Sequence, residues 1–146
     1  FCKMIIDKIS YKDYNELEII GKASLPIYYD SQEINFLNLE TNSIMIKGTL
    51  DNQIIAFMFC KFIENNKKIH INSIAVHHLF RNKGYGTAMI DYLKRYNCDL
   101  TLNVSQNNLK GIHFYKENSF KIKSVIKDYY NNFKNNNAYL FEYIKT

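Results

Sequence analysis

Residues Val76–Ala88 read VHHLFRNKGYGTA, and they decide the fold because they join a strand-like run to a helix-like run through a loop with two glycines. Gly84 and Gly86 allow backbone amides to approach a phosphate closely, and the start of the following helix adds partial positive charge. Arg81 and Lys83 place full positive charges in the same loop. The pattern predicts a phosphate-binding loop, with an ordinary helix entry as an equally frequent alternative.

Two common phosphate-binding motifs are excluded by the letters of the loop. A dinucleotide fingerprint needs a third glycine where Met89 stands, followed by an acidic residue at the required distance. A Walker loop needs Gly-Lys-Ser/Thr, which the chain lacks. A coenzyme site or a plain turn before a helix therefore remains.

The strand before the loop carries a break in side-chain parity. Ile69 and Ile71 share one parity, whereas Ile74 and Val76 share the other. Since successive side chains of a strand point to opposite faces, one extra residue would return all four to one face. The pattern predicts a β-bulge near Asn72-Ser73, or else a strand that is buried on both faces.

Periodicity and turn residues locate the other elements. Helical spacing predicts helices at residues 13–24, at 31–39 with Ser31 as N-cap, after the glycine loop with Met89, Leu93 and Tyr96 on one face, and at 109–118. Apolar runs between turn residues predict strands at 4–9, 44–50, 54–63, 67–76, 100–104, 120–127 and 138–144. Antiparallel strands followed by alternating strands and helices indicate an α+β fold, a mixed αβα sandwich.

Composition limits the class of protein. Of 146 residues, 47% are hydrophobic and 23% charged, which is typical of one globular domain spanning residues 1–146, and no apolar run is long enough for a membrane span. Cys2, Cys60 and Cys98 have irregular spacings without a metal-type pairing, which favours reduced thiols in a cytoplasmic or nuclear protein and no metal site. A net charge of +5 without an extended basic stripe fits a polyanionic small molecule better than nucleic acid.

The glycine loop resembles the acetyl-CoA motif of the GCN5-related N-acetyltransferase (GNAT) superfamily, in which Arg-x-x-Gly-x-Gly follows a strand. A second signature of that superfamily matches downstream at Asn108, Gly111, Phe114, Tyr115 and Phe120, with Ser119 where glycine is usual. The resemblance implies a central, mostly antiparallel, splayed sheet flanked by helices. It also implies that acetyl-CoA is the cosubstrate and that no metal is required.

The same resemblance implies which residues hold the coenzyme. They belong to the strand end, the loop and the helices after it: Ile74, Ala75, Val76, Arg81, Asn82, Lys83, Gly84, Tyr85, Gly86, Thr87, Asn108 and Tyr115. A backbone amide near Val76 would hold the thioester carbonyl. Tyr115 occupies the family position beside the coenzyme sulfur, where its hydroxyl would donate a proton to the departing thiolate.

Two tyrosine-containing segments, LPIYYD at Leu25–Asp30 and KDYYNNFKNNNAYLFEY at Lys127–Tyr143, resemble the peptide-gripping loops of eukaryotic protein N-terminal acetyltransferases. The similarity is greatest to the NatE catalytic subunit and runs from about Ile9 to Tyr143. It implies that the peptide is bound by Leu25, Pro26, Ile27, Tyr29, Asn72, Tyr129 and Tyr130. Asn72 stands where the family has a methionine in the pocket for the first residue, a departure that bears on any preference for initiator methionine.

The acceptor amine must lose a proton, and the resemblance locates two residues for that step. In the NatE subunit, a tyrosine on the bulged strand and a histidine on the next strand order a water. The aligned residues here are His70 and Asn103. Imidazole is suited to accept a proton directly or through water, whereas an amide only orients. The alternative for His70 is an exposed residue at a strand entrance, and His77 and His78 are expected to be loop residues.

The predicted function is acetyl-CoA-dependent acetylation of the α-amino group of protein N-termini of the Met-apolar type, by direct attack in a ternary complex. Two alternatives stay open: acetylation of lysine side chains or small amines, and an acetyl-CoA-binding subunit with little activity of its own. The resemblance implies a protein N-terminus as the acceptor, with an auxiliary subunit and the ribosome as further partners.

Overall fold

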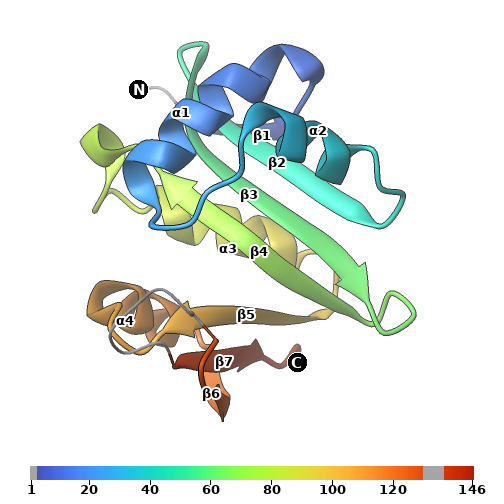
Figure 1. Ribbon diagram of the computed structural model, residues 1–146, viewed down its shortest axis with the longest axis vertical. Coiled ribbons are helices and arrows are strands. Elements are labelled where there is room, and N and C mark those ends of the chain that lie inside the picture. The colour runs from blue at the N-terminus through green and yellow to red at the C-terminus, as the bar shows by residue number, and fades with distance from the viewer. Residues whose placement is uncertain (1–2, 130–136) are drawn as a thin grey trace.

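The computed structural model describes residues 3–129 and 137–146, which form a seven-stranded sheet in the order β1-β2-β3-β4-β5-β7-β6 (Figure 1). The strands are β1 (Ile5–Lys8), β2 (Ser43–Leu50), β3 (Gln53–Ile63), β4 (Lys68–Val76), β5 (Asp99–Ser105), β6 (Lys121–Ile126) and β7 (Ala138–Tyr143). The helices are α1 (Tyr14–Ser24), α2 (Ser31–Asn38), α3 (Tyr85–Lys94) and α4 (Leu109–Glu117), with 3-10 turns η1 (Tyr11–Asp13) and η2 (His78–Phe80).

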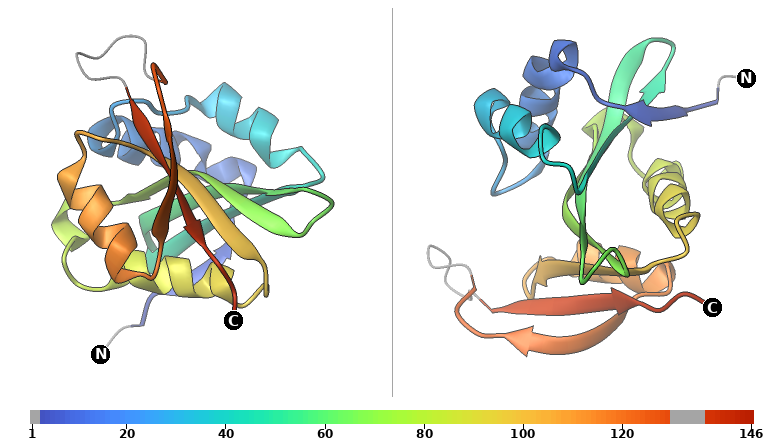
Figure 2. Two further views of the ribbon diagram at one scale, coloured as in Figure 1. Left: turned by 90° about the horizontal axis from the view of Figure 1, so that it is seen from below. Right: turned by 90° about the vertical axis from the view of Figure 1, so that its right-hand side faces the viewer.

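Helices cover both faces of the sheet. Figure 2 shows α1 and α2 on one side of the central strands and α3 on the other. Two hydrophobic clusters correspond to these layers: Leu17, Ile20 and Ile34 of α1 and α2 pack in one, and Met89 and Leu93 of α3 pack in the other. The predicted mixed α+β sandwich is confirmed. No helix in the described part of the chain is long and apolar enough to cross a membrane.

The sheet opens between β4 and β5, its only parallel pair among the described strands. The two strands pair from Lys68 with Asp99 through Ile71 with Leu102. Beyond that point β4 continues to Val76 and β5 to Ser105 without pairing with each other, although each still pairs with its other neighbour. Figure 1 shows the two ribbons diverging toward their C-terminal ends. The predicted splayed sheet is therefore confirmed, and the fork begins immediately after Ile71 and Leu102.

A β-bulge lies on β4 beside the fork, as the parity break predicts. Phe59 of β3 pairs with Ser73, whereas the next residue, Cys60, pairs with Ile71, so Asn72 is the extra residue. Because of this insertion, Ile71 and Ile74 both pack in the cluster under α3. Ala75 joins the cluster under α1 and α2. The bulge thus changes which face each residue of the second half of β4 occupies.

Two local predictions need correction. The N-cap of α2 is Asp30, not Ser31: the Asp30 carboxylate accepts from the Glu33 amide at 2.8 Å, and the Glu33 carboxylate accepts from the Asp30 amide at 3.1 Å. The Ser31 hydroxyl instead donates to the Glu18 carboxylate at 2.9 Å. Helix α3 ends at Lys94, so Tyr96 lies beyond it, in a turn that Asn97 closes with a φ of 58°.

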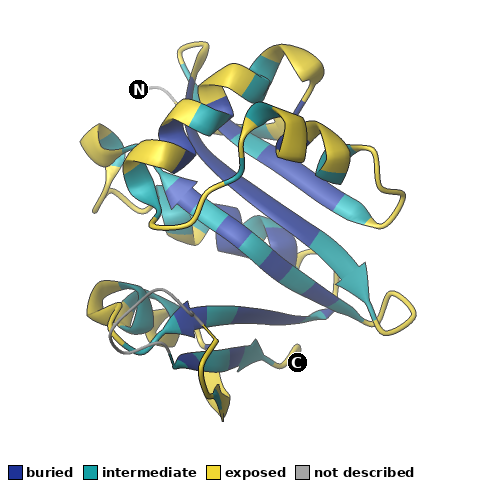
Figure 3. Ribbon diagram, viewed as in Figure 1, coloured by how far each residue is buried: buried dark blue, intermediate teal, exposed yellow. Residues whose placement is uncertain are grey.

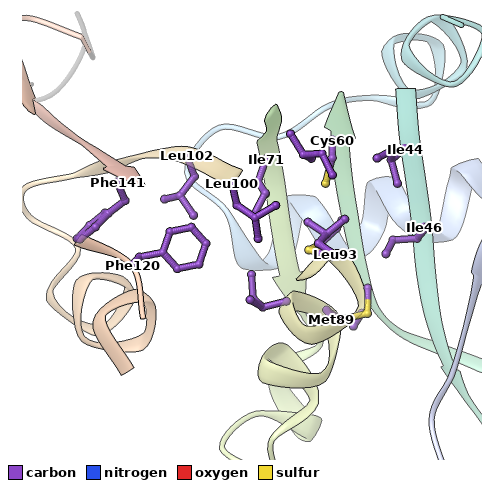
Figure 4. Packing of buried hydrophobic residues seen from close by; sticks show 14 of the residues in the cluster. Ile44, Ile46, Cys60, Ile71, Met89, Leu93, Leu100, Leu102, Phe120 and Phe141 are labelled. Atoms are coloured by element: carbon purple, nitrogen blue, oxygen red, sulfur yellow. The ribbon is translucent and has the colours of Figure 1, made fainter. Parts of the chain in front are cut away.

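The cluster under α3 is the larger of the two and extends along the sheet from β2 to β7. Figure 3 shows buried residues concentrated on the central strands, and Figure 4 shows Met89 and Leu93 of α3 beneath side chains of β2, β3, β4 and β5. Phe120 and Phe141 extend this cluster past Leu102 toward β7. Each fully buried side chain of this size contributes on the order of 1.5–3 kcal/mol. This packing holds β5 and β7 in place where the sheet forks.

Candidate functional site

The glycine loop ends at an uncapped helix start. Gly84 is the N-cap of α3, with a φ of 86° and no side chain to cap the first amides. A Cβ placed on Gly84 would meet nothing within 4 Å, so the space over the helix start is open. Asn82 also adopts a left-handed conformation, with a φ of 60°. Unpaired amides at the positive end of a helix form a binding site for a phosphate group.

Two cations flank this helix start. The Arg81 guanidinium donates from Nε to the Val76 carbonyl oxygen at 2.9 Å, which ties the loop to the end of β4. Arg81 and Lys83 are both exposed, so their charges are available to an anion. Charge, open amides and a left-handed glycine therefore occur together in this loop.

The second signature packs against the loop. A Cβ on Gly86 would lie 3.0 Å from Cζ of Phe114, so glycine permits α3 and α4 to approach each other here. Asn108 caps α4, since its Oδ1 accepts from the Gly111 amide at 2.9 Å. The structure thus joins residues 84–87 with the part of the chain around 108–115.

Tyr115 lies half-buried on α4 among aromatic side chains. Its ring centroid is 5.2 Å from that of Phe114, 5.8 Å from Phe120 and 5.9 Å from Phe141. These contacts fix the orientation of the Tyr115 ring between α4 and β7. Tyr115 therefore stands beside Phe114, the residue that meets the glycine loop.

His70 lies on the face of the sheet opposite Ile69 and Ile71. Its Nδ1 is 2.7 Å from the Thr101 hydroxyl of β5. On its other side, His70 pairs with Lys61 of β3. Burial and then the positive charge of Lys61 lower the pKa of His70, which makes the imidazole neutral near pH 7.

Asn103 comes directly after Leu102, the last residue of β5 that pairs with β4. Its Nδ2 donates to the Tyr129 hydroxyl at 3.2 Å. Its Oδ1 is buried and has no hydrogen-bond partner among the described residues. The fork thus contains a buried amide oxygen without a partner among the described residues, an arrangement that is uncommon in folded proteins and calls for an explanation.

Tyr29 and Tyr129, one from each tyrosine segment, lie within electrostatic range of each other. The Tyr29 ring packs 6.1 Å from that of Phe59 in β3. Burial, followed by the neighbouring Tyr129 and Glu33, raises the pKa of Tyr29. Tyr29 and Tyr129 therefore influence each other electrostatically, although they are 100 residues apart in the chain.

The remaining residues predicted to bind the acceptor differ in burial, and one of them cannot be described. Leu25 is partly buried against the cluster of α1 and α2, whereas Pro26 and Ile27 are exposed. Asn72 is the bulged residue of β4 and is partly buried. Tyr130 lies outside the described residues.

His70 and Asn103 share one face of the sheet but belong to different hydrogen-bonded pairs. His70 pairs with Thr101, and Asn103 pairs with Tyr129. Sequence reasoning missed Thr101, although its parity in LTLNV equals that of Asn103 and places both on the polar face of β5. The register of β4 against β5, which puts Thr101 opposite His70, is what the sequence does not supply.

The family model described as Acetyltransferase (GNAT) family matches residues 11–120. The chain belongs to the GNAT family. An uncharacterized N-acetyltransferase of Methanocaldococcus jannaschii is 27% identical over 134 residues, which make up 87% of this chain and 84% of that protein.

Solved structures share the whole GNAT fold of this chain. Ard1 from Thermoplasma volcanium superposes with a TM-score of 0.88 at 26% identity, covering 98% of each chain. Arabidopsis thaliana Naa50 in complex with the bisubstrate analogue CoA-Ac-MVNAL gives a TM-score of 0.82 at 20% identity, covering 95% of this chain and 97% of that one. Arabidopsis thaliana NAA60 in complex with acetyl-CoA gives 0.85 at 20% identity, covering 97% and 99%.

These findings confirm the predicted family and make the chain an acetyl-CoA-dependent N-acetyltransferase. The GNAT loop seen here fits the coenzyme: the start of α3 is open and uncapped, and Arg81 and Lys83 stand beside it. Bound acetyl-CoA supplies an acetyl thioester. The described residues contain no group of three or more His, Cys, Asp or Glu side chains arranged to hold a metal ion.

Proposed function

We propose that this enzyme acetylates the α-amino group of protein N-termini, with the acceptor nitrogen bound at Asn103. The buried Oδ1 of Asn103, which lacks a partner among the described residues, carries the proposal. Leaving such an oxygen unsatisfied costs about 1–3 kcal/mol, and an N–H of the incoming amine would remove that cost. Because Asn103 lies at the fork after Leu102, an amine bound there is beside the space between β4 and β5.

We propose direct transfer in a ternary complex. One N–C bond forms, the C–S bond breaks, the nitrogen loses one proton and the sulfur gains one. Tyr115 is the proposed donor of the proton to sulfur, and a backbone amide near Val76 the proposed partner of the thioester carbonyl. Burial raises the pKa of the Cys60 thiol, and Cys98 is also buried, so neither is suited to act as a covalent nucleophile.

Peptide binding is proposed for the tyrosine loops. Tyr29 and Tyr129 bring aromatic rings and hydroxyl groups to the side of the sheet that carries Asn103. Tyrosine suits this role because it buries apolar area while its hydroxyl bonds the peptide backbone. The Naa50 structure, whose analogue carries the sequence MVNAL, supports a Met-apolar acceptor. Leu25, Pro26 and Ile27 are proposed to form the apolar wall for such a peptide.

A peptide panel tests the proposal. Peptides that vary the first two residues are offered with acetyl-CoA, next to N-terminally blocked peptides with an internal lysine and next to polyamines. Mass spectrometry is expected to find the acetyl group on the free N-terminus, with Met-apolar peptides turned over fastest. Turnover confined to lysine or polyamines would contradict the N-terminal assignment and support the alternative acceptors.

A second candidate is an acetyl-CoA-binding subunit with little activity of its own. It is favoured by His70 and Asn103, which replace the tyrosine and histidine of the NatE subunit. Tight acetyl-CoA binding by the isolated protein without transfer to any peptide would support it. An auxiliary subunit, ribosome association and a cytoplasmic location remain part of the proposal for either function.

A further inference from the structure

The Thr101 hydroxyl has one hydrogen-bond partner among the described residues, Nδ1 of His70 at 2.7 Å. Thr101 is only 6% exposed, so water does not readily replace that partner. The other ring nitrogen of His70, Nε2, has no partner in the described part of the chain. Asn103 Oδ1 is the single buried side-chain nitrogen or oxygen atom left unpaired there, so Nε2 of His70 is not fully buried. His70 pairs with Thr101 and therefore lies on the face of the sheet that carries Asn103.

These contacts distinguish the two neutral forms of the imidazole. A hydroxyl has one hydrogen to donate, and leaving it unpaired in a buried site costs free energy. If Thr101 donates to Nδ1, its hydrogen is satisfied, and the imidazole proton is on Nε2. If His70 donates from Nδ1, the Thr101 hydrogen has no acceptor among the described residues. The first form is therefore the more stable one.

We propose that Thr101 is a positioning residue that holds His70 with its proton on Nε2, so that His70 presents a hydrogen-bond donor to the acceptor site and the amine must arrive already neutral. This inference rests on the proposed function. It differs from the expectation that His70 accepts the proton of the amine. A site without a general base acetylates only amines that are already neutral, and it therefore selects acceptors by their pKa.

The charges around His70 agree with this role. Lys61 faces it from β3 and disfavours a protonated imidazole. Glu142 of β7 lies beyond Thr101 and forms ion pairs with Lys68 at 3.5 Å and with Lys123 at 3.6 Å. Asp99, two residues before Thr101, accepts from the Lys145 amide at 3.0 Å. No carboxylate of the described residues is hydrogen-bonded to His70 to make it a stronger base.

The transfer balances without an added base. A neutral amine attacks with its lone pair, the N–C bond forms and the C–S bond breaks. The proton that nitrogen loses equals the proton that the leaving thiolate takes up. An α-amine with a pKa of about 7.7–8.0 is about one-third neutral at pH 7.5, whereas a lysine amine with a pKa of about 10.4 is about 0.1% neutral. Such a site favours α-amines over lysine by about 300-fold before any other contact is made.

Spectroscopy of the protein without coenzyme tests the tautomer. Long-range proton–nitrogen correlation spectra distinguish a protonated ring nitrogen from one with a lone pair, and His70→Gln assigns the signals. We expect Nε2 to be protonated and Nδ1 to carry the lone pair, with Thr101→Ser unchanged and Thr101→Val shifted to a mixture. His113→Gln, on the exposed side of α4, is the control. A proton on Nδ1 in the unsubstituted protein overturns the proposal, whatever the enzyme acetylates.

Kinetics test the consequence. We expect kcat/KM to rise with pH along one limb whose midpoint equals the α-amine pKa of the peptide, and to move with it when that pKa is changed. His70→Gln keeps an N–H donor and is expected to lower kcat/KM a few-fold, against about 10-fold or more for His70→Ala, with the limb kept in both. A limb that stays at one pH for all peptides and disappears in His70→Gln would show that His70 is the base. Absence of turnover on every N-terminal peptide would refute the proposed function while leaving the tautomer result to be decided by spectroscopy.

Discussion

Nε of Arg81 donates to the carbonyl oxygen of Val76 at 2.9 Å, so the residue that opens the glycine loop also holds the last residue of β4. The loop and the strand end are therefore one unit. Because Gly84 leaves the start of α3 uncapped, this unit presents amides and positive charge to the same space. Binding of the coenzyme and the position of the strand end should depend on one another through Arg81.

Arg81→Ala is expected to raise the Kd for acetyl-CoA about 10-fold, because a charge-assisted contact of about 1.5 kcal/mol is lost and the loop is released from β4. Arg81→Lys keeps the charge but not the bond to Val76, so its Kd for acetyl-CoA should lie between those of the unsubstituted protein and Arg81→Ala. Calorimetric titration measures these affinities. Arg95→Ala removes an arginine that lies over the Tyr92 ring, away from the loop, and is the matched control. Equal affinity of Arg81→Ala and the control would contradict the assigned role.

Ser119 stands where the family has glycine, and the structure gives it a φ of 72°. A left-handed conformation is costly for a residue with a side chain. Ser119→Gly should therefore stabilise the protein by about 0.5–1 kcal/mol, after allowing for the greater entropy of glycine in the unfolded chain. Urea unfolding measures the change. Ser124→Gly, in β6 at a residue without a positive φ, is the control and should destabilise the protein by about the same amount. A loss of stability in Ser119→Gly would contradict the inference that the positive φ of Ser119 is costly.

The sequence was informative where local chemistry determines the structure. The bulge at Asn72 was predictable because the parity break is visible in the letters, and the turn at Asp51 and Asn52 because these residues tolerate positive φ. The N-cap of α2 could not be predicted, because aspartate and serine are both good caps. The choice between Asp30 and Ser31 depends on Glu18, whose carboxylate accepts a hydrogen bond from the Ser31 hydroxyl.

Contacts between distant segments were the part that could not be predicted. The pairing of His70 with Thr101 depends on the register of β4 against β5, whose connection contains α3. The bond from Asn103 to Tyr129 depends on where the chain places Tyr129 after β6 ends at Ile126. Neither relationship leaves a periodic signal in the chain, so the residue types at the site were found while their partners were not.

His70 should make folding stability depend on pH. Burial and then Lys61 lower its pKa in the folded protein, so below about 6.5 the unfolded chain binds the proton more readily than the folded one. The contribution of neutral His70 is present above about pH 6.5 and is lost as pH falls through the lower, folded pKa. Urea unfolding at pH 7.5 and pH 5 is expected to show a smaller loss at low pH in His70→Gln than in the unsubstituted protein. His113→Gln should retain the full loss, and an identical pH dependence in all three proteins would contradict the burial of His70.

Substitution of Asn103 should lower activity without a comparable loss of stability. Asn103→Leu has similar volume and removes the buried Oδ1 that lacks a partner among the described residues, so the free energy of unfolding should fall little or rise, by up to about 1 kcal/mol. The same change deletes the proposed acceptor for the amine and should lower kcat/KM by about 10-fold or more, with the Kd for acetyl-CoA unchanged.

Tyr129→Phe is the companion variant, since it removes the partner of Nδ2 while leaving Oδ1 in place. Because Oδ1 is the atom assigned to the amine, Tyr129→Phe should retain more activity than Asn103→Leu. An Asn103→Leu enzyme with full turnover of N-terminal peptides would show that the amine binds elsewhere at the fork.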